Sequence, residues 1–293
     1  MNFNLPRPIR KLVNSIKKRT NTIFYYCQAR LHRRKLPSKR LEIEVITMMY
    51  NEAILAPLFI RHYATWVDRM TVFYSESADD TRRILEAMAV ECGLKRLTII
   101  PIEFPNGFDD LLKIEHINRA VRESKADFVV CVDADEFVYP NPPEGADPRK
   151  NLAMEMENIV RCNIYHVYRH STDEDIDPKK APFFQRRHGS CEIDNKGRKN
   201  LYSKPCIVRP DSGVQFLAGC HGVTKRFPES RNVWIGAHWG KADVFCIERY
   251  VRDRGARLSE NNKKNNLGIE KLTMTENQLR AELKAHENDP LLF

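Results

Sequence analysis

The chain has 293 residues, of which 42% are hydrophobic and 30% are charged; this composition excludes a wholly disordered chain and suits one large or two small globular domains. The formal charge of +9 is concentrated in residues 1–40, which hold 12 Lys and Arg and no Asp or Glu. The remaining residues carry 36 basic and 39 acidic side chains, a net charge of −3. Such a body lacks the basic surface of a nucleic-acid-binding protein, so we expect no nucleic-acid partner.

The cysteines and the apolar segments bear on the cellular compartment. The eight cysteines include no C-x-x-C pair, and several lie in apolar, strand-like runs, which predicts reduced and mostly buried thiols. No run of about 18 apolar residues is present, so the sequence predicts no membrane span. The N-terminus lacks the long apolar core of a signal peptide. We therefore expect a cytoplasmic protein.

Residues 1–40 are predicted to form a basic amphipathic N-terminal arm. Apolar residues recur in it at helical spacing, with Lys and Arg on the other faces: Ile9, Leu12, Val13, Ile16, Ile23, Phe24, Cys27 and Leu31. A helix of this kind can lie in the headgroup layer of an anionic membrane, which would make the protein peripheral on the cytoplasmic face. The alternatives are a solvated helix docked on its own domain and an irregular arm.

From residue 41 onward, strand and helix patterns alternate. Strands are expected over residues 42–50, 69–75, 94–103, 127–137, 201–210 and 214–227, helices over 52–66, 79–92, 110–125 and 242–258, and a short helix followed by a strand over 152–170. Alternation with short connections predicts an α/β fold, in which a mostly parallel twisted sheet is flanked by helices. We expect one domain over residues 41–265 and a C-terminal helix and tail over 266–293.

The segment "DFVVCVDADEFVYP" (127–140) carries an apolar strand into the core and then places Asp133, Asp135 and Glu136 together. In parallel sheets, ligands bind at the carboxyl ends of the strands. Asp133 and Asp135 can face one side of the strand end, and a divalent cation such as Mg²⁺ or Mn²⁺, which also binds a substrate diphosphate, would relieve their repulsion. The alternative is an acidic turn with solvated carboxylates.

Other polar residues are expected at the same edge of the sheet. Asn51 and Glu52 follow the first strand, and the segment "SESADDT" (75–81) follows the second. Within that segment Ser77, Asp79 and Thr81 could be ligands or could cap the next helix. Asn118, in the helix before the acidic cluster, could hold a loop or contact a ribose.

Four stretches of this sequence carry a family resemblance: "MMYNEAILAPLFIRHYATWVDRMTVFYSESADDT", "INRAVRESKADFVVCVDADEFVYP", "LYSKPCIVRP…GCHGV" and "AHWGKADVFCIERYVRDRG". They resemble the glycosyltransferase family 2-like group with the GT-A fold, in particular the bacterial single-domain subset related to glycosyltransferase family 92. The resemblance extends over most of residues 42–257. It implies a GT-A-like fold, a nucleotide-sugar donor, Mn²⁺ or Mg²⁺, and transfer of the sugar to an acceptor.

The resemblance also implies roles for individual residues. Asn51 and Glu52 would line the donor nucleotide pocket, and Ser77 and Asp79, which match the family's S-x-D, would contact the base or ribose. The chain has Tyr74 and Ser75 where relatives commonly show D-N, which puts the base preference in doubt. The remaining assignments give catalytic roles to Asp133, Asp135 and Glu136, metal ligation to Asp133, Asp135 and His221, donor contacts to Asn118 and Lys204, and possible further site roles to His238, Trp239 and Lys241.

Several of these residues have a plainer interpretation. One of the two histidines, His221 or His238, could complete the metal shell or contact phosphate. His238 and Trp239 could equally be a packing pair in the core. Lys204, Arg209 or Lys241 could offset charge on the leaving nucleotide, although surface charge is the default interpretation for such residues.

The sequence therefore predicts a metal-dependent glycosyltransferase, of the hexosyl type or a related one, acting on a saccharide, lipid-linked or other cell-surface glycoconjugate acceptor. An inverting reaction needs a base near the acceptor hydroxyl, and the sequence leaves the choice open among Glu136, Asp173, Asp175, Asp177, Glu192 and Asp194. The acceptor region 170–198 matches the family weakly. The alternatives are another divalent-metal phosphoryl-transfer enzyme, either a phosphohydrolase or a nucleotidyltransferase, and a non-catalytic binding protein tethered to a membrane.

Overall fold

The computed structural model describes residues 40–189, 201–224, 227, 229–230, 232, 234–249, 257–267 and 275–293. The N-terminal arm, apart from Arg40, lies outside the described residues. The same is true of the candidate bases Glu192 and Asp194 and of residues 250–256 of the expected helix. Within the described residues, no helix combines the length and the apolar character needed to cross a bilayer.

One eight-stranded sheet organises the chain, in the order β3-β2-β1-β4-β7-β6-β8-β5. The strands are β1 (Ile43–Met49), β2 (Arg69–Tyr74), β3 (Arg96–Pro101), β4 (Phe128–Cys131), β5 (Glu136–Pro140), β6 (Ile159–His166), β7 (Leu201–Val208) and β8 (Trp234–His238). Strands β3, β2, β1 and β4 are parallel, as are β6 and β8, whereas β7 is antiparallel to both β4 and β6, and β5 is antiparallel to β8. The expected α/β fold with a mostly parallel sheet is confirmed.

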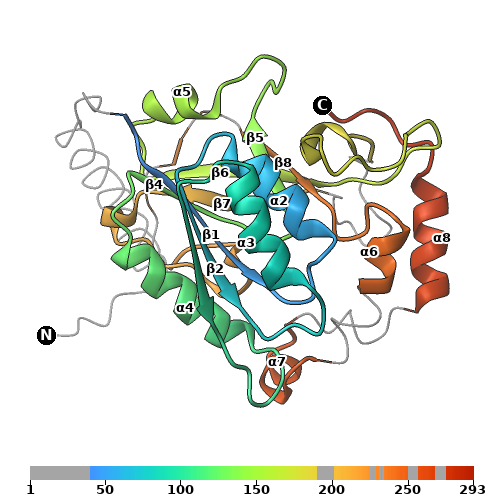
Figure 1. Cartoon of the computed structure of the whole chain (residues 1–293), viewed down its shortest axis with the longest axis horizontal. Helices are drawn as coiled ribbons and strands as arrows, with labels where there is room; N and C mark the ends of the chain where they lie inside the picture. Colours follow the sequence, from blue (N-terminus) through green and yellow to red (C-terminus); the bar gives the residue numbers. More distant parts are fainter. Residues whose placement is uncertain are drawn as a thin grey trace, which may run out of the picture.

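Helices cover both faces of this sheet, because the central strands are apolar on both sides. The helices are α2 (Leu55–Ala64), α3 (Thr81–Glu91), α4 (Asp110–Glu123), α5 (Pro148–Ala153), α6 (Val244–Arg249), α7 (Glu260–Lys264) and α8 (Glu276–His286), with 3₁₀ turns η1 (Pro182–Phe184), η2 (Pro210–Ser212) and η3 (Ala218–Cys220). Helices α2 and α3 lie together on one face and α4 on the other (Figure 1). In β1, Val45 belongs to the core under α2, while its neighbour Ile46 packs with Ile117 of α4.

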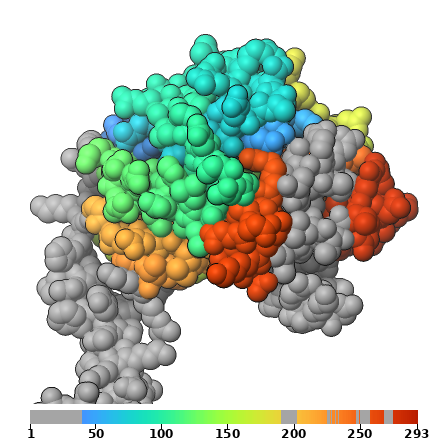
Figure 2. Space-filling model, turned by 90° about the horizontal axis from the view of Figure 1, so that it is seen from below, coloured from blue at the N-terminus to red at the C-terminus, as the bar shows by residue number. Residues whose placement is uncertain are grey.

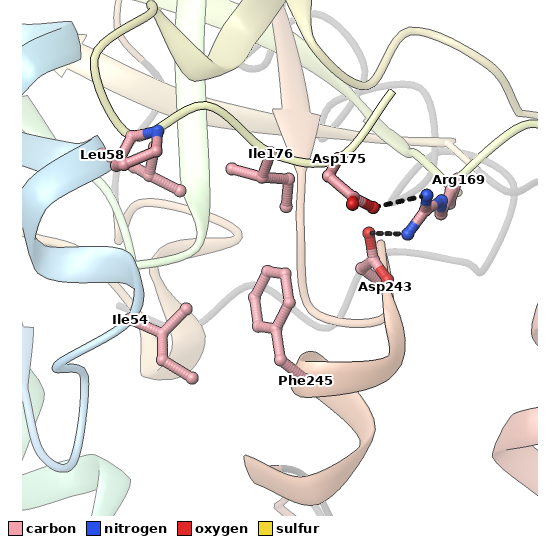
Figure 3. A pocket seen from close by; sticks show the side chains of 8 residues that line it. Ile54, Leu58, Arg169, Asp175, Ile176, Asp243 and Phe245 are labelled. Carbon is pink, nitrogen blue, oxygen red and sulfur yellow. Dashed lines mark hydrogen bonds and ion pairs between the residues drawn. The ribbon is translucent and has the colours of Figure 1, made fainter. Parts of the chain in front are cut away.

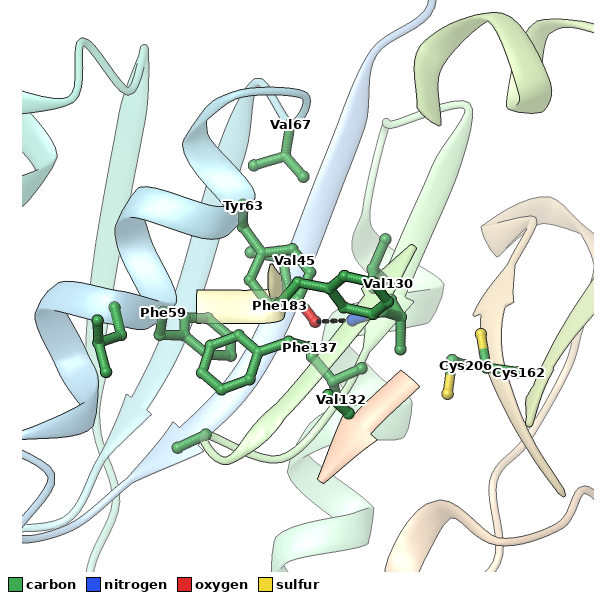
Figure 4. Close-up of a cluster of buried hydrophobic side chains, with 14 of the residues drawn as sticks. Val45, Phe59, Tyr63, Val67, Val130, Val132, Phe137, Cys162, Phe183 and Cys206 are labelled. Atoms are coloured by element: carbon green, nitrogen blue, oxygen red, sulfur yellow. Dashed lines mark hydrogen bonds between the residues drawn. The ribbon is translucent and has the colours of Figure 1, made fainter. Parts of the chain in front are cut away.

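The larger core cluster lies between α2 and the sheet and is rich in aromatic side chains (Figure 4). Phe59 and Tyr63 of α2 have ring centroids 4.6 Å apart, and Phe59 lies 6.3 Å from Phe137 of β5. The Tyr63 hydroxyl donates to the Glu136 carbonyl at 2.8 Å and accepts from the Val138 amide at 3.2 Å. This buried hydroxyl is therefore satisfied, and it fixes the start of β5 beside the acidic cluster.

Two sequence expectations differ from the structure. The single strand expected over 127–137 is two strands, because the chain turns after β4 and re-enters the sheet as β5 at its far edge. The strand expected over 214–227 is wrong: η3 lies within it, and its β-pairing in the described residues is one bridge between Phe216 and Val223. Gly219 has φ of 68° in this turn, a conformation that glycine adopts easily and that breaks an extended segment.

The C-terminal residues pack against the rest of the chain. Helix α8 contacts α6, the Leu292 amide donates to the Arg187 carbonyl at 2.9 Å, and the Phe293 ring stacks on Phe183 at 4.8 Å. Residues 257–267 lie against the start of α4 (Figure 2), where the Asp110 amide donates to Asn262. The division between 41–265 and 266–293 stays a prediction.

A buried carboxylate joins four elements at the edge of the sheet opposite the acidic cluster. Asp68 accepts hydrogen bonds from the Ile43 amide at 3.1 Å, from Lys95 at 2.6 Å and from Arg149 at 2.5 Å. Burial raises the pKa of Asp68, but the hydrogen bonds from Lys95, Arg149 and Ile43 outweigh it and lower the pKa below its usual value. The ionised form is therefore stabilised by folding.

We predict that Asp68→Asn lowers the free energy of unfolding at pH 7 by roughly 1–3 kcal/mol, because it leaves buried donors without an anionic acceptor. A depressed folded-state pKa contributes stability above the unfolded value, about 3.9, and that contribution disappears as the pH falls through the folded value. The difference between wild type and variant should thus narrow below pH 4 in urea titrations. Asp80→Asn, which removes an exposed carboxylate paired with Arg83, is the control; equal effects of the two variants would contradict the prediction.

Candidate functional site

The carboxyl ends of β1, β2 and β4 meet at one edge of the sheet, because these strands are parallel neighbours. Residues 132–135 follow β4, and the loops after β1 and β2 hold Asn51 and Ser77. The structure therefore gathers most of the residues singled out in the sequence at one edge, where open α/β sheets bind their ligands.

The loops after β1 and β2 are joined by side-chain to main-chain hydrogen bonds. Ser77 accepts from the Asn51 amide at 3.0 Å, Asn51 accepts from the Ala78 amide at 2.8 Å, and Thr81 accepts from the Glu52 amide at 2.7 Å. Asn51 has φ of 50°, a left-handed conformation that Asn tolerates better than most residues. These contacts hold the two loops in one rigid arrangement.

Asp79 takes part in the same arrangement. Its carboxylate accepts from the Ala53 amide at 3.1 Å and from the Thr81 amide at 3.0 Å. The second contact is the local turn at the start of α3 that the capping alternative describes. The assignment of Ser77 and Asp79 to donor binding stays a prediction, and the contacts show that both side chains also shape the loops.

Asp133 lies between two buried lysines. Its Oδ1 accepts from Lys113 Nζ at 2.6 Å and its Oδ2 from Lys204 Nζ at 3.2 Å, while 35% of its own side chain is exposed. Burial raises the pKa of Asp133, but the two lysines hold it well below its usual range. Asp133 is thus ionised across the physiological range and presents a partly exposed anion with its charge already balanced.

Lys113 is a residue of the acidic cluster that was not predicted from the sequence. It lies on the buried face of α4 with Ile114, Ile117 and Val121. A lysine four residues before Ile117 on that apolar face is the signal that could have identified it, because a buried lysine requires an anionic partner.

Glu136 is held inside the protein. Its Oε2 accepts from Lys204 Nζ at 2.7 Å and from the Asp133 amide at 2.8 Å, and its Oε1 accepts from the Tyr202 hydroxyl at 2.8 Å. Lys204 is fully buried; burial opposes its charge, but Asp133 and Glu136 raise its pKa well above the usual value. These contacts favour a structural role for Glu136, and its catalytic assignment stays a prediction.

Asp135 is 1% exposed and is linked to the β1 loop through an arginine. Arg249 of α6 lies 3.3 Å from Asp135 Oδ2 and donates to Glu52 Oε1 at 2.6 Å. Burial disfavours the charge on Arg249, but Glu52 and Asp135 raise its pKa. Arg249 could not be recognised as a site residue from the sequence, because the pattern of a helix rich in charged residues does not distinguish a buried arginine from an exposed one.

His238, at the end of β8, faces Asp135. Its Nε2 lies 3.4 Å from Asp135 Oδ2, and its Nδ1 lies 2.8 Å from Nδ1 of His166. A Cβ atom at Gly240 would fall 2.7 Å from His238 Nε2 and 3.5 Å from Asp135 Oδ2. A side chain at residue 240 would therefore collide with the imidazole, and glycine leaves the side of the ring next to Asp135 uncovered by a Cβ.

Asp135 and His238 offer one carboxylate oxygen and one imidazole nitrogen, 3.4 Å apart, that suit a divalent cation as neighbouring ligands. Within the described residues, no three His, Cys, Asp or Glu side chains converge as a complete metal shell. Mg²⁺ usually takes one or two protein ligands and completes its shell with substrate phosphates and water, so a carboxylate and an imidazole side by side would be enough protein ligands. The predicted trio Asp133, Asp135 and His221 does not form one donor group here, and its metal assignment stays a prediction.

Two further predicted residues are His221 and Lys241. His221 lies near the site, with its ring 5.1 Å from that of Tyr202, and burial lowers its pKa, as does Lys204. Lys241 donates to both Glu282 oxygens at 2.8 and 2.9 Å.

Three residues have structural contacts. Asn118 donates to the Phe216 carbonyl and accepts from its amide, which is the loop-holding alternative. Trp239 is fully buried, with its ring 5.4 Å from Phe137, which agrees with the packing alternative. Arg209 stacks over Phe128 at 4.0 Å at the opposite edge of the sheet, so it does not face the acidic cluster.

A pocket of about 320 Å³ lies beside the site, between the start of α2 and α6 (Figure 3). Its walls are apolar, and one end carries Arg169, paired with Asp175 at 2.7 Å and with Asp243 at 3.7 Å. Asp175, a candidate base, is 93% exposed there. Asp173 and Asp177, in contrast, accept hydrogen bonds from the main chain, at His170 and at Lys179.

Comparisons with known proteins give limited information. No protein-family model matches the chain, and no curated protein matches it. Among solved structures, the chain is similar to TarS 1–349 from S. aureus, with 13% identity over 79% of this chain and 71% of that one, at a TM-score of 0.37. It is also similar to glucosyl-3-phosphoglycerate synthase from Mycobacterium tuberculosis in complex with Mn²⁺, UDP-glucose and phosphoglyceric acid, with 19% identity over 44% of each chain, at a TM-score of 0.28.

The match to the synthase thus spans less than half of that protein. At these identities and TM-scores, the arrangement of the site residues, not the comparisons, must carry any functional proposal.

We predict that Lys204→Met lowers the free energy of unfolding by about 3–5 kcal/mol, because it leaves Glu136 buried without its cation. Adding Glu136→Gln should restore part of the loss, since the orphaned charge is removed. Urea titrations of the single and double variants measure both effects. Lys150→Met, which removes an exposed lysine near Asp147, should change little; additive losses in the double variant would show that the two side chains are not coupled.

Proposed function

We propose that this protein is a glycosyltransferase that uses a nucleotide-diphospho-sugar donor and Mn²⁺ or Mg²⁺. The observation that carries the proposal is the approach of His238 Nε2 to Asp135 Oδ2, at 3.4 Å, beside a glycine, Gly240, whose missing side chain would collide with this imidazole. The order of "NE", S-x-D and D-x-D along the sequence supports it, because the fold places all three motifs at this edge.

Asp135 and His238 would hold the cation, which when bound offsets negative charge on the leaving nucleoside diphosphate. Arg249 orients Asp135 from the side of α6. Asp133, with its charge balanced by Lys113 and Lys204, would accept a hydrogen bond from the donor's ribose or bind a water of the cation. The rigid loops at Asn51 and Ser77 would bind the nucleoside.

The acceptor would be a saccharide or a lipid-linked or cell-surface glycoconjugate, bound in the pocket of Figure 3. Ligand pockets combine apolar walls with a few polar groups that fix orientation. Here Phe245 and Ile54 supply apolar surface, and Asp175 and Arg169 supply hydrogen-bonding groups. Asp175 is the exposed carboxylate among the described candidates for the base, so it is our choice for that role.

We predict that UDP or GDP binds with Mn²⁺ present and at least tenfold more weakly without it, an order of magnitude expected when a cation bridges protein and diphosphate. Asp135→Ala should abolish the metal-dependent part of the affinity, whereas Glu115→Gln, on the exposed side of α4, should retain it. Isothermal titration measures the affinity of each variant with and without Mn²⁺. The nucleotide that binds, UDP or GDP, identifies the nucleobase of the donor.

Two outcomes would contradict the proposal. If neither nucleotide binds, with or without metal, the donor assignment fails. If a nucleotide sugar is consumed and releases phosphate or diphosphate without sugar transfer, the reaction is phosphoryl transfer.

The basic arm supports a second, separate expectation about location, since its 12 Lys and Arg are unopposed by acidic residues. We propose that it binds anionic lipid on the cytoplasmic face of the membrane, as basic segments do at about 1 kcal/mol per cation near the surface.

We predict that the full chain floats with vesicles containing phosphatidylserine at low salt and that a chain starting at Leu41 does not. Vesicles of neutral lipid are the control. Equal flotation of the two chains would assign membrane binding to another surface, and flotation of neither would remove it.

A further inference from the structure

His166 has no role in the function proposed above, although it contacts the site. It ends β6 directly beside His238 at the end of β8, in parallel register. The two ring planes are inclined at 66°, with centroids 4.7 Å apart, and their Nδ1 atoms are 2.8 Å apart. A distance this short between two ring nitrogens requires one proton between them.

We propose that His166 is a positioning residue that fixes the tautomer and orientation of His238, and so sets the affinity of the site for its divalent cation. The inference rests on the proposed function, because it concerns the cation held by Asp135 and His238. It adds a residue that touches neither the cation nor the substrates.

The direction of the hydrogen bond follows from the role of His238. For Nε2 of His238 to offer its lone pair to a cation beside Asp135, the ring must carry its proton on Nδ1. That proton points at Nδ1 of His166, which must then accept. Histidines that bind metals generally donate their second ring N–H to a fixed acceptor, and that partner orients the ring.

His166 is placed to accept this proton. A neutral imidazole carries one unprotonated nitrogen that can accept a hydrogen bond, and Nδ1 of His166 lies 2.8 Å from Nδ1 of His238.

The surrounding residues hold His166 in place. Its ring lies 5.7 Å from that of Tyr202, whose hydroxyl donates to Glu136. The Val167 amide, next in the chain, donates to the His238 carbonyl at 3.2 Å. His166 thus connects the charge-balanced cluster at Glu136 with the imidazole beside Asp135.

Three substitutions separate a positioning role from a purely structural one. His166→Asn places an amide oxygen close to where Nδ1 lies and can still accept. His166→Gln carries its amide one carbon farther out, near the position of Nε2, and His166→Leu has similar bulk with no acceptor. If His166 has a structural role, the loss of Mn²⁺ affinity in the three variants should follow how well each side chain fills the space of the imidazole. If His166 has a positioning role, the loss should depend on whether the variant keeps a hydrogen-bond acceptor at the position of Nδ1.

The measurement is the Kd of Mn²⁺, in the presence of the nucleotide that wild type binds, by electron paramagnetic resonance of free Mn²⁺, with thermal unfolding recorded for each variant. We expect His166→Leu and His166→Gln to weaken Mn²⁺ binding roughly 10–100-fold, and His166→Asn to remain within about threefold of wild type, a difference under 1 kcal/mol.

Other results overturn the inference. Unchanged Mn²⁺ affinity in His166→Leu would show that His238 needs no acceptor. Equal weakening in His166→Asn and His166→Gln, in step with lost thermal stability, would show a packing role. Failure of wild type itself to bind Mn²⁺ would instead remove the proposed metal site, and the inference with it. If His166→Leu does not fold, the comparison of Asn with Gln decides alone.

Discussion

Charge balance inside the protein is the constraint on which this structure depends. Asp133, Asp135 and Glu136 lie within four residues at the end of a buried strand, where isolated carboxylates would be too costly to keep ionised. Lys113 and Lys204 compensate Asp133 and Glu136, and Arg249 compensates Asp135 and Glu52. Each cation comes from a different element, so the cluster also ties α4, β7 and α6 to the turn after β4.

This compensation shapes what the site can bind. With both lysines paired to carboxylates, the cluster around Asp133 is close to neutral. Asp135 and Glu52 both contact Arg249, and Asp135 Oδ2 also lies 3.4 Å from Nε2 of His238. A lysine ammonium has no lone pair to offer a cation, whereas an imidazole has one, so the proposed cation is assigned to Asp135 and His238 and not to Asp133.

The alternation of elements could be predicted from the sequence, because parallel strands buried on both faces are continuous apolar runs and the helices between them are amphipathic. The D-x-D segment could be placed at the carboxyl edge for the same reason. The strand over 214–227 could not be recognised as wrong, since its apolar residues pack as a turn held by Asn118. The partners of Asp135 and of His238 could not be predicted either: Arg249 and His166 come from a helix and a strand distant in sequence, and only tertiary contacts bring them to the site.

The roles of several predicted residues depend on burial, which sequence alone does not give. Trp239 and Glu136 are residue types that often occur in binding sites, but both are buried. Asp175 is one of several acids in a polar segment, and it is the exposed one beside a pocket. Gly240 gave no signal at all, because the importance of a glycine next to His238 appears once the position of its missing Cβ is known.

The ion pair between Glu52 and Arg249 joins residues 197 positions apart, and this separation has a consequence for how the protein is made. The parallel strands β1, β2, β3 and β4 all lie in the first half of the chain, which leaves the ribosome first. Asp133 finds Lys113 within that first half. Asp135 must wait for Arg249, so a nascent chain that has folded its sheet still lacks a finished site. The contacts of Asp135 are therefore completed only after α6 has been translated.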